Sequence, residues 1–209
     1  MSARGVFVTF EGIEGSGKTT QVRRLSAHLS AQGIPHIVTR EPGGTPLADQ
    51  VRAMLLAPRE ETVFPETELL LYQAARAQHV RGLLIPALEA GKVVLCDRFY
   101  DATFAYQAHA RKLDAETISM LNRFASGNLV PDLTLLFDLP PELGISRIAH
   151  RGAADRIERE SLDFHQAVRN GYLAIFKSDT GRIALIDASA PEEEVFRLLL
   201  ETVAERFGW

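Results

Sequence analysis

A glycine-rich segment near the start of the chain carries residue types that bind phosphate. Residues 12–19 match the pattern G-x-x-x-x-G-K-[ST] in full. Glycines let backbone N–H groups converge on a phosphate, and a helix that begins there adds positive potential. The Lys18 ammonium can reach β- and γ-phosphates, and the Thr19 hydroxyl can bind Mg²⁺. The segment therefore predicts a site for a nucleoside triphosphate with Mg²⁺, formed by Gly12, Ile13, Glu14, Gly15, Ser16, Gly17, Lys18 and Thr19.

Two charged side chains, Asp97 and Arg98, directly follow a short apolar run over residues 93–96. In an open parallel sheet, ligands bind at the carboxyl ends of the strands. A carboxylate there can hold a metal ion or accept a hydrogen bond from a hydroxyl, and a guanidinium can bind a phosphate through two N–H groups. A simple surface ion pair is the alternative. Asp138 is a rival carboxylate, which we rank lower because Pro140-Pro141 follows it.

Two further pairs of side chains stand four residues apart, which places each pair on one face of a helix. In the first pair, Tyr72 offers an aromatic plane and Arg76 offers hydrogen-bond donors. That combination suits a pyrimidine ring with carbonyl oxygens, although a core aromatic beside a surface arginine is the alternative. The second pair, Thr103 and Gln107, follows Asp97 within ten residues.

The elements that must position these residues are short strands alternating with helices. Apolar, β-rich runs over residues 6–10, 36–39, 93–96, 133–137 and 183–186 predict five buried strands. Helical spacing of apolar residues predicts helices over 17–31, 47–56, 66–90 and 192–207. This alternation is typical of an α/β fold with a parallel sheet covered by helices on both faces.

The composition excludes several classes of protein. The chain has 209 residues, of which 46% are hydrophobic and 24% charged, as in ordinary globular proteins. Its formal net charge of −4 argues against a general nucleic-acid binder. It contains no apolar run near the roughly 20 residues of a membrane helix. A single cysteine, Cys96, fits a reducing compartment, so we expect a cytoplasmic protein.

Four motifs together resemble the thymidylate kinase family. They are Phe10-Glu11-Gly12 with the phosphate segment, the sequence T-R-E-P-G-G-T at 39–45, D-R-F-Y at 97–100 with A-Y-Q at 105–107, and R-G-x-x-D-R-I-E at 151–158. The resemblance extends from about residue 5 to the C-terminal helix. It implies a P-loop kinase fold with strand order 2-3-1-4-5, in one domain over 1–209 with a lid around 150–160. It further implies Mg²⁺-dependent transfer of the γ-phosphate of ATP to dTMP, giving dTDP and ADP for dTTP biosynthesis, by a homodimer.

The resemblance also implies a role for individual residues. Lys18 and Thr19 would hold the donor phosphates and the metal, with Asp97 as catalytic residue and second metal ligand. Arg98 would bind the acceptor phosphate, and Glu14 would lie near the 3′-hydroxyl. The remaining expected contacts are Arg40 and Arg52 with the acceptor phosphate, Arg147 with adenine, Tyr72 and Arg76 with thymine and its 4-carbonyl, Thr103 and Gln107 with its imide edge, and Tyr106 with the sugar. Phe99 and Ala102 depart from the Tyr and Ser usual in the family, so neither is given a catalytic role.

The expected lid contains three arginines, Arg151, Arg156 and Arg159. Phosphoryl transfer spreads negative charge over the moving group, and cations must stabilise it. Because the variable positions of the phosphate segment carry no basic residue, we expect the lid to supply this charge, with Arg151 as a catalytic residue that also contacts ATP. Alternatively, the neighbouring acidic residues neutralise these arginines, above all Arg159, which lies among glutamates.

Two other functions stay open at this point. One is a kinase for another nucleotide or for a deoxynucleoside. The other is a nucleotide-binding switch with negligible phosphate transfer, although the chain has no guanine-reading Asn-Lys-x-Asp segment. The ligands expected in all cases are small molecules, with no nucleic acid and no membrane as partner.

Overall fold

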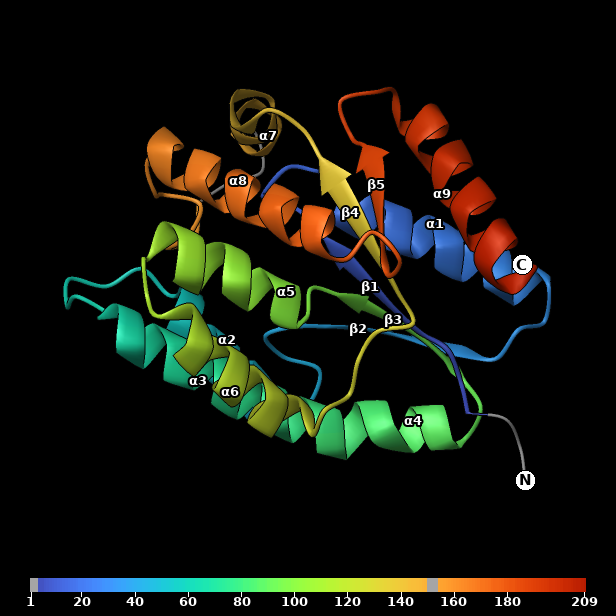
Figure 1. The fold of residues 1–209 in the computed structure, drawn as a ribbon, viewed down its shortest axis with the longest axis horizontal. Coiled ribbons are helices and arrows are strands. Elements are labelled where there is room, and N and C mark those ends of the chain that lie inside the picture. Colours follow the sequence, from blue (N-terminus) through green and yellow to red (C-terminus); the bar gives the residue numbers. More distant parts are fainter. Residues whose placement is uncertain (1–3, 150–153) are drawn as a thin grey trace.

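The computed structural model describes residues 4–149 and 154–209, and within them five parallel strands form one sheet. The strand order is β2-β3-β1-β4-β5, as predicted (Figure 1). The strands are β1 (Phe7–Glu11), β2 (His36–Arg40), β3 (Val93–Asp97), β4 (Leu133–Asp138) and β5 (Ile183–Asp187). This order places β1 at the centre, so the segment that follows it emerges in the middle of the sheet's carboxyl edge.

Strand boundaries agree with the expected ones to within one residue. All five residues of β1 are buried, as are Leu133–Phe137 of β4, because helices cover these strands on both faces. Most strands extend one residue further than their apolar runs, so that Asp97 is the last residue of β3 and not the residue after it. Asp97 pairs in register with Phe10 on one side and Arg40 on the other.

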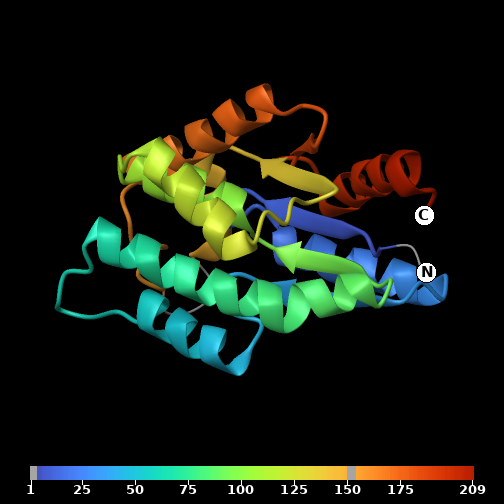
Figure 2. The ribbon, with the colours of Figure 1, turned by 60° about the horizontal axis from the view of Figure 1, so that its bottom comes forward.

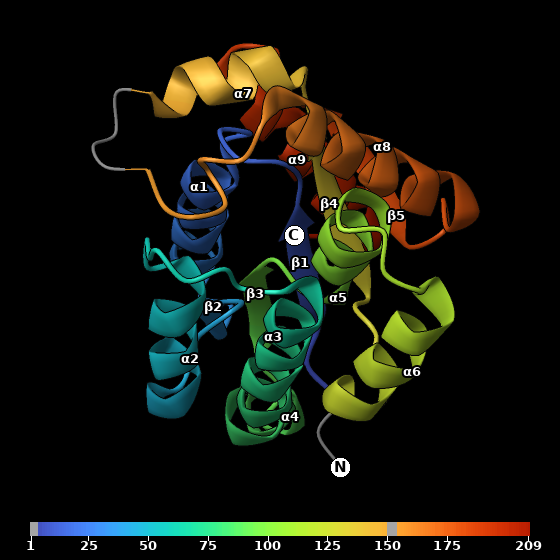
Figure 3. The ribbon, with the colours of Figure 1, turned by 90° about the vertical axis from the view of Figure 1, so that its left-hand side faces the viewer.

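Helices lie on both faces of the sheet (Figures 1 and 3). On one face α1 (Lys18–Ala31) contacts β1, β2 and β3, and α9 (Glu192–Phe207) contacts β5 and α1. The other face carries α3 (Pro65–His79), α4 (Ile85–Glu89), α5 (Tyr100–Thr103) and α8 (Leu162–Ser178). Helices α2 (Pro46–Leu56) and α6 (Ala115–Ser126) pack against α3, and α7 (Pro141–Ile148) packs against α8. Figure 2 shows α2 and α3 side by side.

The helix predicted over 66–90 is continuous but changes its winding. Between α3 and α4 lies a π-helical turn, η1 (Val80–Leu84), in which the N–H of Ile85 donates to the carbonyl of Val80, five residues back. Pro86 follows directly and has no N–H, so the regular hydrogen bond from this position cannot form. The wider turn adjusts the winding next to that missing bond.

A second π-helical segment, η2 (Phe104–Ala110), continues α5. Here the N–H of Arg111 donates to the carbonyl of Tyr106. Such turns occur often at functional sites because they redirect side chains without ending the helix. Together α5 and η2 carry Thr103, Tyr106 and Gln107 toward the carboxyl edge of the sheet, where the candidate site lies.

None of the helices in the described parts of the chain combines the length and apolar character needed to cross a bilayer.

Candidate active site

A cavity at the carboxyl edge of the sheet brings most of the predicted residues together. One end is lined by the phosphate loop and β3, through Glu14, Gly15, Lys18, Thr19, Asp97 and Arg98. The other end is lined by helices α2, α3, α5 and η2, through Arg52, Tyr72, Arg76, Thr103, Tyr106 and Gln107. Residues Asp155, Ile157 and Glu158 of the expected lid line it as well.

The phosphate loop takes a conformation that needs its glycines. Gly12, Gly15 and Gly17 all have positive φ angles, of 139°, 73° and 83°. A Cβ atom at Gly12 would lie 2.4 Å from the backbone oxygen of Phe137, which is closer than real Cβ atoms come to other atoms. A Cβ atom at Gly15 would collide with the carbonyl of Gly144. Helix α1 then begins at Lys18, so its first N–H groups face the cavity's phosphate end.

Lys18 lies folded over the loop and not in solvent. Its Nζ donates to the carbonyls of Gly12 (3.0 Å) and Ile13 (2.8 Å) and to Ser16 Oγ (3.1 Å). Burial, and then the nearby Arg98 guanidinium, lower the pKa of Lys18 to about 8. An arriving phosphate would replace these neutral acceptors with negative charge, which is a stronger partner for the ammonium.

Thr19 and Asp97 form a pair of oxygen ligands. Thr19 Oγ1 donates to Asp97 Oδ2 at 3.0 Å, between the first turn of α1 and the end of β3. One hydroxyl and one carboxylate fit Mg²⁺, which usually keeps several waters and takes its other ligands from substrate phosphates. The described residues contain no group of three or more His, Cys, Asp or Glu side chains placed to hold a metal ion.

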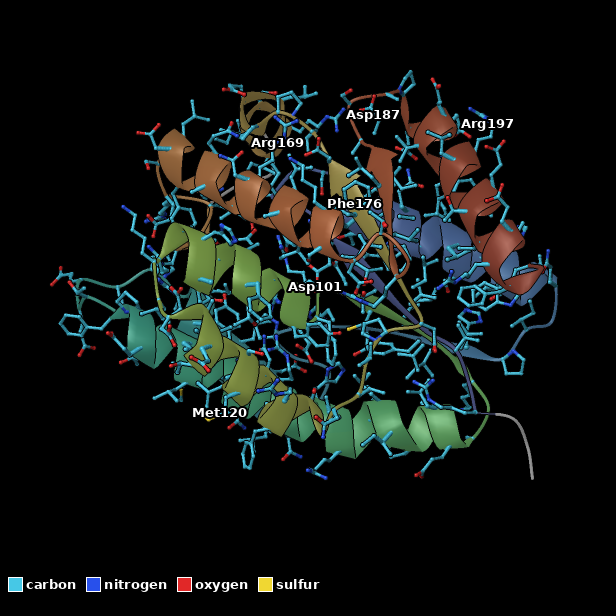
Figure 4. All side chains as sticks on the ribbon, in the orientation of Figure 1. Asp101, Met120, Arg169, Phe176, Asp187 and Arg197 are labelled. Atoms are coloured by element: carbon cyan, nitrogen blue, oxygen red, sulfur yellow. The ribbon has the colours of Figure 1, made fainter. Side chains whose placement is uncertain are left out.

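The rival carboxylate, Asp138, is engaged elsewhere. It accepts two hydrogen bonds from Arg169 of α8, at 2.7 and 2.8 Å, and does not line the cavity (Figure 4 labels Arg169). Asp97 lines the cavity and Asp138 does not.

Arg98 is held in an unusual backbone conformation. Its φ angle is +71°, in the left-handed region that side chains other than Gly rarely adopt. The guanidinium donates to Gly12 O (2.9 Å), to the Tyr172 hydroxyl (3.0 Å) and to Glu14 Oε1 (2.8 Å), and it lies 5.1 Å from the Tyr106 ring centre. These contacts hold Arg98 in a strained backbone conformation, which is common where a side chain must point at a ligand.

Glu14 is the acceptor at the centre of this end of the site. Besides Arg98, its Oε1 accepts from the Tyr106 hydroxyl at 2.6 Å, and its Oε2 lies 3.4 Å from His165 Nδ1. Burial alone would raise the pKa of Glu14, but Arg98, His165 and Lys18 outweigh it and lower the pKa far below its usual value. Glu14 is therefore ionised and can accept a hydrogen bond from a ligand hydroxyl.

Arg76 is a buried residue and not the surface arginine that the alternative interpretation allowed, with 2% of it exposed. Its Nε donates to Glu41 Oε2 at 2.7 Å, and its Nη1 donates to Thr103 Oγ1 (2.9 Å) and Asn122 Oδ1 (2.7 Å). Its Nη2 donates to the carbonyl of Phe99 at 3.2 Å. Of the five N–H donors of a guanidinium, this leaves one Nη2 hydrogen for a ligand.

The described part of the expected lid, residues 154–160, lies in a turn beside the cavity. Arg156 donates to Glu68 Oε2 (2.6 Å) and to the carbonyl of Leu55 (2.8 Å), so it ties this segment to α3 and α2. Arg159 is exposed, and the partner of its side chain among the described residues is Ala154 O, within the same segment. Arg151, the predicted catalytic arginine of the lid, lies outside the described residues.

Outside the phosphate loop, two predicted contacts, Arg40 and Arg147, do not line the cavity. Arg40 is exposed and pairs with Asp49 at 3.1 Å. Arg147 is half-buried behind the phosphate loop, where it donates to Ala188 O at 2.9 Å. Arg52 does line the cavity and is held by the carbonyl of Pro42 at 3.0 Å.

Four buried residues that support the site were given no role by the sequence analysis. Glu11, Glu41, Glu68 and His165 each contact a cavity residue or its backbone. Glu41 lies within the 39–45 motif, so its position there was an available signal. Glu68 and His165 stand in helical segments where nothing distinguishes them from surface residues, and only the fold brings them to the site.

Comparison with known proteins agrees with the four motifs. The family model described as thymidylate kinase matches residues 10–199. A thymidylate kinase of Pseudomonas savastanoi pv. phaseolicola is 53% identical over 191 residues, 91% of each chain. One of Citrifermentans bemidjiense is 51% identical over 208 residues, covering 97% of this chain and 92% of its own. One of Carboxydothermus hydrogenoformans is 49% identical over 193 residues, covering 92% and 94%.

Proposed function

The chain belongs to the thymidylate kinase family and is a phosphotransferase that phosphorylates dTMP with ATP, and from this premise we propose how its cavity performs the reaction. The observation that carries the proposal is the continuity of the cavity. It runs from the phosphate loop, past Asp97 and Arg98, to a pocket lined by Tyr72, Thr103 and Gln107. A donor nucleotide entering at one end and an acceptor at the other would meet at the β3 terminus.

On the donor side, the loop and Lys18 bind the β- and γ-phosphates of ATP. Thr19 and Asp97 would hold Mg²⁺, which when bound would supply positive charge to the reacting phosphates. Arg147, on the outer side of the loop, contacts adenine. The side chains of Thr19, Asp97 and Arg147 are held by hydrogen bonds within the protein before ATP arrives, so little reorganisation of them is needed at the moment of transfer.

On the acceptor side, Arg98 binds the phosphate of dTMP, with Arg52 and Arg40 as further cations. Glu14, kept ionised by its neighbours, accepts from the 3′-hydroxyl, and Tyr106 packs beside the sugar. Tyr72 stacks on thymine. The free Arg76 donor and Gln107 bind the carbonyl and imide groups of the base.

Positive charge for the transferring phosphoryl group comes from Lys18, Arg98 and the lid, with Arg151 as its catalytic arginine. Three described lid residues, Asp155, Ile157 and Glu158, line the cavity, which supports a role of the expected lid in covering bound nucleotides and excluding water. Asp97, the last residue of β3 and part of the cavity lining, would be the catalytic carboxylate at the reacting phosphates.

A coupled assay of ADP release tests this assignment, with dTMP, dUMP, dCMP, AMP and GMP offered as acceptors. We expect turnover with dTMP well above all but dUMP. Lys18→Ala should retain the fold and lose several orders of magnitude in turnover, as phosphate-clamp losses do. Preference for AMP or GMP would contradict the acceptor assignment, and near-parental turnover of folded Lys18→Ala would contradict the donor site.

We further propose that the protein is a cytoplasmic homodimer. Helices α3 and α6 pack together and expose large apolar side chains, among them Leu70, Met120 and Phe124. Met120 points away from the body of the molecule in Figure 4. Adjacent apolar residues on two packed helices are typical of a surface that a second copy covers.

A further inference from the structure

The orientation of the Gln107 side-chain amide is determined by a buried carboxylate. Gln107 Nε2 donates to Glu68 Oε1 at 2.8 Å, and Glu68 is only 1% exposed. An ionised carboxylate accepts hydrogen bonds but cannot donate them. Reversing the amide would set two oxygens against each other in a buried place, so its nitrogen must face Glu68.

The amide oxygen is thereby left for the cavity. Gln107 lines the cavity, and among the described residues no group donates to its Oε1. Position 107 therefore offers a ligand an acceptor, while one of the two amide hydrogens is held by Glu68.

Glu68 is held in its ionised state by two arginines. Arg111 Nε lies 3.2 Å from Oε1, and Arg156 Nη2 lies 2.6 Å from Oε2. Burial alone would raise the pKa of Glu68, but the arginines and the bond from Gln107 outweigh it and lower the pKa. The same carboxylate thus fixes the base-facing amide on η2 and anchors the lid segment through Arg156.

We propose that Glu68 is a positioning residue that sets base choice by holding the Gln107 oxygen toward the cavity. This inference rests on the proposed function, in which that end of the cavity receives the base. The ring nitrogen N3 of thymine or uracil carries a hydrogen and donates to this oxygen. The N3 of cytosine has no hydrogen, so oxygen and nitrogen lone pairs would face each other in a buried site.

The test compares dissociation constants of dTMP and dCMP, measured by calorimetry without ATP so that turnover is not needed. In Glu68→Gln, the new amide can donate to Gln107 Oε1, which lets Gln107 turn its N–H₂ group toward the cavity. We expect the ratio of the two constants to move toward dCMP by about tenfold or more, as for a buried donor or acceptor left unpaired. Glu68→Gln also weakens the contact with Arg156 that anchors the lid, and this should reduce the affinity for both ligands alike. The ratio of the two dissociation constants therefore reports on the Gln107 amide alone.

Two further variants complete the experiment. Glu160→Gln removes a carboxylate from Arg111 in the same cluster without touching Gln107, and its ratio should equal that of the parent. The exchange Glu68→Gln with Gln107→Glu places a carboxylate, which only accepts, at position 107 and should restore the preference for dTMP. An unchanged ratio in Glu68→Gln, or no recovery in the exchanged pair, would overturn the proposal.

The proposal stays testable if Glu68→Gln does not fold. A crystal structure of the parent with dTMP must then show the Gln107 amide within hydrogen-bond distance of both Glu68 and N3, and an amide turned away from Glu68 would overturn the inference. Failure of the proposed function looks different, because the parent would then neither bind nor phosphorylate dTMP.

Discussion

Buried carboxylates position the arginines of this site. Removing both charges of such a pair from water costs free energy, which other interactions must offset. Glu41 accepts from Arg76 and from His79, and Glu14 accepts from Arg98. Burying two charges is unfavourable unless their geometry and further hydrogen bonds are good, and removing one partner leaves the other uncompensated. Substitutions of these arginines therefore change stability as well as ligand binding.

Arg76→Ala illustrates this. The variant leaves Glu41 buried with only His79 beside it, so we expect a loss of about 3–5 kcal/mol in the free energy of unfolding. Urea denaturation measures this loss. Arg159→Ala, at an exposed position, should stay within about 0.5 kcal/mol of the parent. If Arg76→Ala were as stable as the parent, the pair with Arg76 would not be what stabilises buried Glu41. In that case a change in the base specificity of the variant could be interpreted without a correction for lost stability.

The lowered pKa of Lys18, about 8, gives a prediction for the pH dependence of activity. Above that pH the free enzyme loses the ammonium charge that attracts phosphates, so kcat/KM for ATP should fall. Bound phosphate restores the charge by raising the pKa, so kcat should remain level to higher pH. Steady-state kinetics measured from about pH 6.5 to about pH 9.5 separate the pH profile of kcat from that of kcat/KM. Equal declines of kcat and kcat/KM would contradict the assignment to Lys18.

Glu11 makes folding stability depend on pH in the opposite way to a salt-bridged acid. It is fully buried, and burial and then Asp101 raise its pKa from 4.5 to about 7. Because the folded state holds this proton more tightly, the stabilising contribution is present below pH 4.5 and is lost as the pH rises toward 7. The loss amounts to roughly 2 kcal/mol between pH 5 and 8.

Glu11→Gln keeps an acceptor for the Phe99 N–H but does not titrate. Its free energy of unfolding should therefore decline less than that of the parent between pH 5 and 8, measured with urea at each pH. Identical pH slopes for the two proteins would mean that Glu11 does not titrate in this range.

At the scale of elements, the phosphate loop and helix α7 approach each other through glycines. A Cβ atom at Gly144 would lie 2.5 Å from Glu14 O, and one at Gly15 would meet Gly144 O. Gly144→Ala should improve helix propensity by up to about 1 kcal/mol yet push α7 and the loop apart. We expect a KM for ATP raised by about tenfold, since small misplacements of binding groups are costly.

Gly181→Ala is the matched control for this substitution, because no atom lies within 4 Å of its Cβ position. It should leave KM for ATP unchanged. If Gly144→Ala behaves like Gly181→Ala, the loop can move without loss of ATP binding, and the close approach has no functional role.

The same scale shows which elements a sequence can predict. Strands and the phosphate loop are local patterns of apolar residues and glycines, so their bounds followed to within a residue. The π-helical turns did not, because they depend on where Pro86 and the packed side chains fall relative to neighbouring helices. The turn at 156–159 likewise follows from the anchoring of Arg156 by Glu68, a contact across 88 residues.

For the molecule as a whole, the strand order was predicted from family resemblance and confirmed, and that order places the phosphate loop beside Asp97. What the sequence could not supply is the set of buried partners. Spacing puts Tyr72 and Arg76 on one helix face, but it cannot show that groups from other elements occupy four of the five donors of Arg76. These groups are Glu41, Thr103, Asn122 and the carbonyl of Phe99. The number of donors left for a ligand depends on the whole fold.

The proposed homodimer gives the prediction for the whole molecule. Phe124 on α6 is 80% exposed, and a Glu there would place charge in the apolar surface formed with α3. Sedimentation velocity should give twice 23.1 kDa for the parent and 23.1 kDa for Phe124→Glu. Leu185→Glu, at an exposed apolar position on β5, should remain dimeric.

Because Asn122 of α6 accepts from Arg76, the monomer should also bind dTMP more weakly while its ATP affinity changes little. A monomeric parent, or a dimeric Phe124→Glu, would show that this surface does not join two copies.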